Sequence, residues 1–178
     1  TETASSRRIT QEYIDSLTIE MRVLDSGPAS TEMNLFGRTF ATPVMTAALG
    51  GLKAICADPM VEVAKGTTAA GSVTWVGVGE SAELQAVIET GAAAVKVIKP
   101  YKDKDMVFAK IADAEKLGAF ALAMDIDFIC GGKMGDNTFR ADIMGPKTVA
   151  DIRGFIAATK LPFVLKGILS EQDAQKAL

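Results

Sequence analysis

The stretch Leu161-Pro162-Phe163-Val164-Leu165-Lys166-Gly167-Ile168-Leu169-Ser170 places one lysine inside an otherwise apolar run. The run opens with a proline and closes at Gly167 and Ser170, which is typical of a buried parallel strand. Ser170 suits the N-cap of a following helix, residues 171–178. Lys166 therefore falls near the C-terminal end of a strand, where α/β proteins carry ligands and chemistry.

Two interpretations of Lys166 follow from the residues alone. A buried ammonium group is costly unless an anion or a cofactor faces it, which favours a functional lysine. Alternatively, the side chain reaches solvent past the strand end or pairs with a structural carboxylate. A single buried lysine is only a probabilistic marker of a site, so both interpretations stay open at this point.

Working outward from this strand, four earlier apolar runs have the same character. They cover residues 43–51, 72–79, 93–100 and 120–127. Helical patterns separate them, with Asp58-Pro59, Ser81 and Thr148 as predicted helix starts. The strands are continuously apolar rather than alternating, which indicates a parallel sheet with both faces covered.

The first 41 residues show a different pattern. Thr10 is predicted to cap a short helix, residues 11–17, and residues 33–40 have the turn and alternation of a small hairpin. We therefore expect an N-terminal extension with a hairpin over residues 1–41, followed by strand–helix units over residues 42–178.

The polar residues of the strands gather at one set of ends. Lys99, Asp125 and Lys166 all fall there, and a (β/α)₈ TIM barrel builds its site from the C-terminal ends of many strands. A doubly wound sheet is the alternative, but no strand is followed by a G-x-G-x-x-G or P-loop motif. The predicted fold class is α/β, a partial TIM barrel of about five βα units, because a barrel typically needs about 250 residues. The chain then represents the N-terminal portion of one barrel domain, or a sheet completed by another chain.

Composition excludes several function classes. The 178 residues carry a net charge of −3 with scattered basic residues, so no footprint for nucleic acid is present. No apolar run reaches the length of a membrane span and no signal sequence is visible, which predicts a cytoplasmic protein without membrane contact. Histidine is absent, which removes His-based acid–base chemistry. Cys56 and Cys130 are far apart and outside any CxxC pair, so neither a disulfide nor a metal site is predicted.

Several short stretches, taken in order, resemble a known family. They are Leu35-Phe36-Gly37, residues 42–48, residues 101–105, residues 114–118, Ala123-Met124-Asp125 and residues 161–167. Their order and spacing resemble the FMN-dependent 2-hydroxy-acid oxidases and dehydrogenases, which include glycolate oxidase and lactate oxidase. The resemblance implies an FMN cofactor, a small 2-hydroxy acid as substrate, a 2-oxo acid as product and a homo-oligomeric enzyme.

The resemblance also implies roles for individual residues. Asp125 and Lys166 would act in catalysis: Asp125 matches the carboxylate that orients the family's catalytic histidine, and Lys166 would face the N1/O2 edge of the flavin. Lys99 replaces a substrate-side tyrosine. The flavin would be contacted by Lys166 and by six further residues, namely Ala48, Leu49, Gly50, Gly77, Val97 and Ala123. A plain strand exit at 48–50 and a salt-bridge or capping role for Asp125 are the alternatives.

Departures from the family pattern put the substrate in doubt. The family's Gln-x-Tyr is Val97-Ile98-Lys99 here, and Lys133 is the nearest cation to a missing arginine. In the family, the catalytic base and the phosphate-binding loops follow the lysine strand, so the 178-residue piece alone is expected to be inactive and to bind FMN weakly. One alternative is a flavin-dependent isomerase of the type 2 isopentenyl diphosphate kind, in which Lys96 and Lys99 meet a phosphorylated substrate. Another is a non-catalytic half-barrel that assembles.

Overall fold

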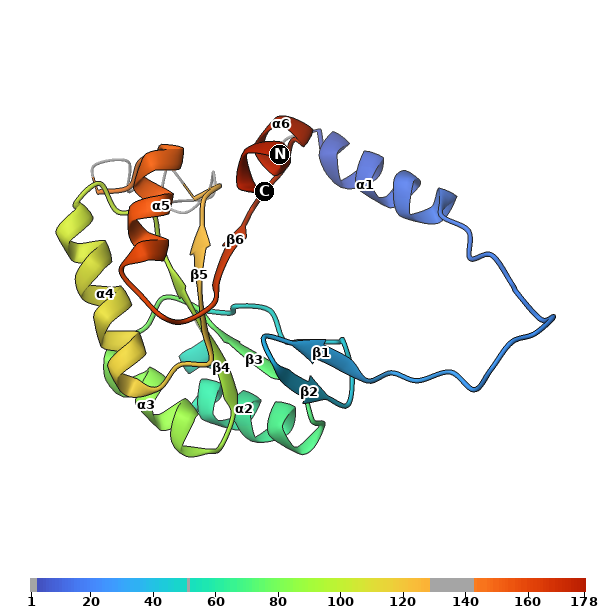
Figure 1. The fold of residues 1–178 in the computed structure, drawn as a ribbon, viewed down its shortest axis with the longest axis horizontal. Coiled ribbons are helices and arrows are strands. Elements are labelled where there is room, and N and C mark those ends of the chain that lie inside the picture. Colours follow the sequence, from blue (N-terminus) through green and yellow to red (C-terminus); the bar gives the residue numbers. More distant parts are fainter. Residues whose placement is uncertain (1–2, 51, 129–142) are drawn as a thin grey trace.

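The computed structural model describes residues 3–50, 52–128 and 143–178 of the chain. Four parallel strands form one sheet in the order β3-β4-β5-β6, so each strand lies beside its neighbour in sequence. Helices α3 to α5 connect these strands, and a separate antiparallel hairpin, β1-β2, lies near one end of the sheet (Figure 1). This is the βα repeat that the sequence predicts.

The strands and helices have the following bounds. The strands are β1 Met33–Leu35, β2 Arg38–Phe40, β3 Val73–Val76, β4 Ala93–Ile98, β5 Ala121–Asp125 and β6 Phe163–Lys166. The helices are α1 Ser5–Ser16, α2 Pro59–Ala69, α3 Ser81–Glu89, α4 Lys104–Leu117, α5 Val149–Ala157 and α6 Glu171–Ala177, with a 3₁₀ turn at Leu52–Ala54.

Each strand sends alternate side chains to two different cores. The helix-facing core joins even-numbered residues of β4 and β5, such as Ala94 and Leu122, to buried residues of α2 to α5. The opposite core joins odd-numbered residues of the same strands, such as Val95 and Ala123, to Phe40 of the hairpin. Because side chains alternate along a strand, the parity of a residue fixes the face on which it lies. We call the face with the odd-numbered residues of β4 and β5 the inner face.

The predicted caps of the later helices are confirmed. Thr148 accepts a hydrogen bond from the N–H of Asp151, and the Asp151 side chain accepts one from the N–H of Thr148, which completes a capping box. Ser170 accepts from the N–H of Asp173, and Pro59 stands in the first turn of α2 after Asp58. These short-range signals set where the helices begin.

Two other predicted caps are wrong. Helix α1 begins at Ser5, and Thr10 lies within it, with its hydroxyl donating to the carbonyl of Ser6 at 2.9 Å. Ser81 is the first residue of α3 rather than its cap, because its hydroxyl donates to Asp113 on α4. In both cases the hydroxyl donates to an oxygen atom elsewhere and accepts no hydrogen bond from the N–H groups at the start of its own helix.

The strand predicted over residues 43–51 does not form as a strand. Its described residues run beside β3, but only one parallel bridge forms, between Leu49 and Val76. The backbone N–H of Trp75 donates to the Thr46 hydroxyl at 3.2 Å, which takes the place of a ladder bond to a neighbouring carbonyl. The sheet therefore has four regular βα units rather than the five expected.

Candidate functional site

Three charged residues form a row across the C-terminal edge of the inner face. The parallel register pairs Ile98 with Met124, which brings Lys99 beside Asp125, and it pairs Asp125 directly with Lys166. The sequence predicted these three residues at neighbouring strand ends, and the structure brings all three together.

The Asp125 carboxylate joins the two lysines. One oxygen, Oδ1, accepts from Lys166 Nζ, and the other, Oδ2, accepts from Lys99 Nζ. Burial would raise the pKa of Asp125, but the hydrogen bonds from Lys166 and Lys99 outweigh it and lower the pKa to about 2. Asp125 is therefore ionised at neutral pH, and the row carries one net positive charge.

The two lysines differ in their surroundings. The Lys99 side chain is only 14% exposed, and its ammonium lies 3.8 Å from the centre of the Phe128 ring. The Lys166 side chain is 36% exposed. Lys99 is thus held on two sides, by a carboxylate and an aromatic face, whereas Lys166 keeps access to solvent.

A second carboxylate, Asp127, stands beside Asp125 and was not among the predicted site residues. A hydrogen bond with Asp125, together with burial, raises the pKa of Asp127. Its carboxyl group occupies the space that a Cβ of Gly167 would need, and Gly167 has a φ of +82°. Only glycine leaves space for this carboxyl group. The signal in the sequence was a second carboxylate two residues after Asp125, in the turn that follows β5.

The predicted flavin-contacting backbone lies next to β3. Ala48 packs against the inner core, and Leu49 forms the bridge to Val76. A Cβ on Gly77 would lie 2.9 Å from the Leu49 carbonyl oxygen, so the close approach of these two segments requires a glycine at 77. Gly50 follows Leu49 and lines a cavity of about 580 Å³ beside the starts of α2 and α3.

Val97 and Ala123 lie on the inner face, in register with each other and one step below the charged row. Both are buried and small. A floor of small apolar side chains beneath a cationic edge suits the flat ring of a flavin, whose N1/O2 edge becomes negative on reduction. Contact of Val97 and Ala123 with the flavin ring stays a prediction.

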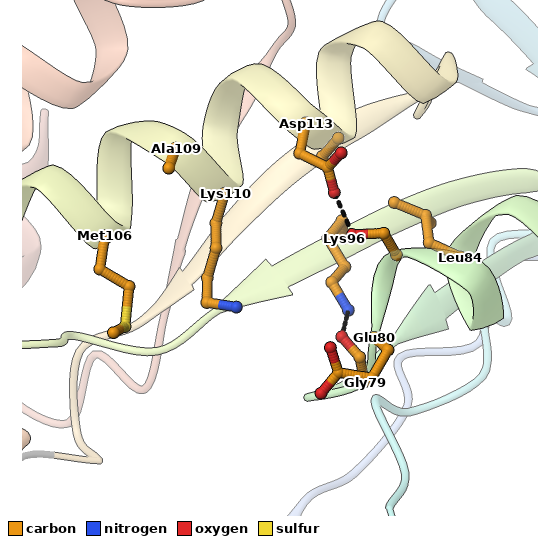
Figure 2. Close-up of a pocket in the computed structure, with 10 residues that line it drawn as sticks. Gly79, Glu80, Leu84, Lys96, Met106, Ala109, Lys110 and Asp113 are labelled. Atoms are coloured by element: carbon orange, nitrogen blue, oxygen red, sulfur yellow. Dashed lines mark hydrogen bonds between the residues drawn. The ribbon is translucent and has the colours of Figure 1, made fainter.

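Lys96 does not join this row. Its side chain points to the helix-facing side of β4, where Nζ donates to the carbonyls of Gly77 and Gly79 (Figure 2). The expectation that Lys96 and Lys99 act together on a phosphorylated substrate is therefore wrong. Their odd spacing of three residues along an extended strand is the sequence signal for opposite faces.

Some predictions fall outside the described residues. Lys133 and Cys130 lie there, as does most of the glycine-rich loop after β5. Within residues 3–50, 52–128 and 143–178, no group of three or more metal-ligating side chains is found. No helix in this part of the chain combines the length and apolar character that crossing a bilayer requires.

Comparison with solved structures identifies the architecture. One mandelate oxidase structure, a Y128F mutant with an FMN monooxide adduct, is 25% identical with a TM-score of 0.74 over 90% of this chain. A second, bound to a difluoro hydroxy acid, is 22% identical with a TM-score of 0.81 over 98%. The chain spans about half of these structures, 50% and 56% respectively. The fold is thus an α/β partial TIM barrel.

The sequence comparisons give the family. No curated protein matches the chain significantly. The family model described as FMN-dependent dehydrogenase matches residues 1–144, which include the inner face of β3, β4 and β5. That model covers most of the sequence and agrees with the structural neighbours, and we conclude that the chain belongs to the FMN-dependent dehydrogenase family.

Proposed function

We propose that this chain forms the flavin-facing part of an FMN-dependent oxidoreductase that converts a small 2-hydroxy acid into a 2-oxo acid. All of residues 1–178 would belong to one barrel domain. The observation that carries the proposal is the Lys99–Asp125–Lys166 row on the inner face, at the end where barrels hold their ligands. Family membership supplies the cofactor class.

The row offers charge where this chemistry needs it. When bound, FMN would take up the electron pair released as the hydroxyl-bearing carbon becomes a carbonyl carbon. Lys166 is the more accessible of the two cations and would place its charge at the edge of the flavin ring. Lys99 would attract the carboxylate of the substrate as a second cation at the same strand ends.

Asp125 would act by holding both lysines rather than by moving protons. Its pKa of about 2 leaves it ionised throughout the physiological range, so it has no proton to donate. In the described structure it fixes two ammonium groups along one line, which organises the cationic edge in advance.

The test is anaerobic reduction of the flavin in the natural polypeptide that carries this sequence. Lactate, glycolate and mandelate are offered separately, and loss of the oxidised flavin's visible absorbance is followed. We expect at least one acid to bleach the flavin. Lys99→Met should weaken the binding of that acid, which would be seen as a raised KM. Lys65→Met, an exposed cation on α2, is the matched control. Flavin that binds but stays oxidised with all three acids would refute the oxidation and favour the isomerase alternative.

A further inference from the structure

Lys96 is a buried lysine that the charged row does not use. The residue is 8% exposed and projects from β4 into a cavity of about 260 Å³ between α3 and α4. Figure 2 shows its ammonium group directed at Gly79, with Lys110 of α4 reaching the same cavity. Burial lowers the pKa of Lys96, and the opposing effect of the nearby carboxylates of Glu83, Glu80 and Asp113 does not outweigh it. Such an environment is costly for an ammonium group.

The two carbonyl groups that accept hydrogen bonds from Lys96 show which segment this buried charge stabilises. The β3–β4 ladder ends at the pair Val76–Lys96, so the residues that follow Val76 have no partner strand for their carbonyls. Lys96 Nζ donates to Gly77 O at 2.8 Å and to Gly79 O at 3.1 Å. The side chain thus extends the hydrogen bonding of the sheet beyond the end of the ladder. It does so in residues 77–80, which we call the β3–α3 loop.

The β3–α3 loop in turn supports the backbone next to it. A Cβ on Gly77 would come within 2.9 Å of the Leu49 carbonyl oxygen, so this glycine is in close contact with the 48–50 segment. Leu49 has only one bridge to β3 to hold it in place. The position of the 48–50 backbone therefore depends on where Gly77 lies, and Lys96 holds the carbonyl of Gly77.

We infer that Lys96 is a positioning residue: from the helix-facing side of β4 it holds the β3–α3 loop and, through Gly77, the 48–50 backbone beside β3. The consequence for flavin rests on the proposed function, in which 48–50 lines the cofactor. The positioning itself concerns only residues of this chain. An apolar residue would be the ordinary choice at a site between helices, because it avoids the cost of a buried charge.

The experiment is amide hydrogen exchange on the chain with Lys96→Met, read in three segments. We expect exchange in residues 77–80 and 47–50 to become about tenfold faster or more, since two hydrogen bonds from a charged donor are lost. Exchange in β5, residues 121–125, should stay unchanged, and the urea midpoint should stay equal or rise. Lys110→Met removes the other cation of the cavity, which has no bond to the loop in the described structure, and should leave all three segments unchanged.

A second variant distinguishes the loss of the N–H donors from the change in side-chain packing. Lys96→Arg keeps N–H donors in a cavity with room for the larger group, and slow exchange in the loop should return. Equal acceleration in the Met and Arg variants would overturn the inference, because the shape of the side chain rather than its donors would then matter. Three further outcomes for the Met variant would also overturn it: unchanged exchange in the loop, exchange that accelerates as much in β5 as in the loop, or failure to fold.

The outcome is independent of the proposed function because no flavin is present. A separate FMN titration of the Met and Lys110→Met variants then tests the link. Weaker FMN binding in the Lys96→Met variant alone is expected. If the exchange result holds while FMN affinity is equal in both, the positioning inference stands and the assignment of 48–50 to the flavin site fails.

Discussion

Removing the charge of Asp125 should destabilise the chain by a large part of its total stability. Asp125→Asn keeps the shape but leaves Lys99 and Lys166 facing an uncharged amide. Two hydrogen bonds between charged groups are worth roughly 3–6 kcal/mol together, at about 1.5–3 kcal/mol each. Lys166 is 36% exposed and regains water, and Lys99 keeps the Phe128 ring, so both lose less than a fully buried partner would. We expect a loss of about 2–4 kcal/mol.

The assay is equilibrium unfolding in urea, with the free energy of unfolding and the m-value fitted for each variant. Glu62→Gln is the matched control, because it also removes a carboxylate from a lysine, Lys65, at 2.7 Å. Both partners of that pair are about 60% exposed, and the expected change is below about 1 kcal/mol.

The reasoning would be refuted by a small effect. If Asp125→Asn and Glu62→Gln lower the unfolding free energy by similar amounts with unchanged m-values, then burial does not strengthen the row. The two lysines would then be better described as solvated side chains that meet a carboxylate by chance.

Three further predictions follow from the same residues. Gly167→Ala should destabilise the chain by about 1–2 kcal/mol, because φ is +82° and the new Cβ meets Asp127. Gly66→Ala, in an open helical position of α2, should stabilise it by up to about 1 kcal/mol. Urea midpoints of the two variants that shift in the same direction would contradict this. The pKa of Asp125 lies at about 2 in the folded state, below its ordinary 3.8, so its contribution is complete above about pH 4 and is lost as the pH falls toward 2. The raised pKa of Asp127 acts in the opposite direction but mainly above its ordinary value of 3.8, outside this pH range. Parallel stability curves for the native chain and Asp125→Asn between pH 4 and 2 would show that the shift of Asp125 is absent. Lys166→Met in the flavin-loaded natural polypeptide should lower the flavin reduction potential and slow reduction by substrate, on the order of 2 kcal/mol, and an unchanged potential with an intact fold would show that the lysine is structural.

Local signals in the sequence were sufficient for most of the elements. Thr148 and Ser170 cap the helices that follow them because a hydroxyl followed by free N–H groups is a short-range arrangement. The apolar runs that became β4, β5 and β6 have the length and the flanking turn residues that are typical of buried strands. Lys99, Asp125 and Lys166 were placed at one edge because parallel strands share a direction.

Tertiary structure decided what these elements do together. The register across three strands turns separate residues at 99, 125 and 166 into one ion-paired row, and register depends on how entire strands pack rather than on any local motif. The same packing shows that Lys166 meets a carboxylate, an interpretation that the sequence had left open.

The 43–51 segment and Lys96 show most clearly which features depend on tertiary contacts rather than on local sequence patterns. The segment has the composition of a strand, yet beside β3 it forms only the isolated bridge at Leu49, and the N–H of Trp75 bonds the Thr46 hydroxyl rather than a carbonyl. Alternation alone could have placed Lys96 and Lys99 on opposite faces. That Lys96 reaches the carbonyls of the β3–α3 loop could not be predicted, because it depends on where the β3–β4 ladder ends and on the turn of chain beyond it. Composition and spacing indicate most of the strands and helices of this protein. The contacts of its charged side chains are set by the pairing of distant segments, since a buried charge takes whatever partner the completed sheet brings within reach.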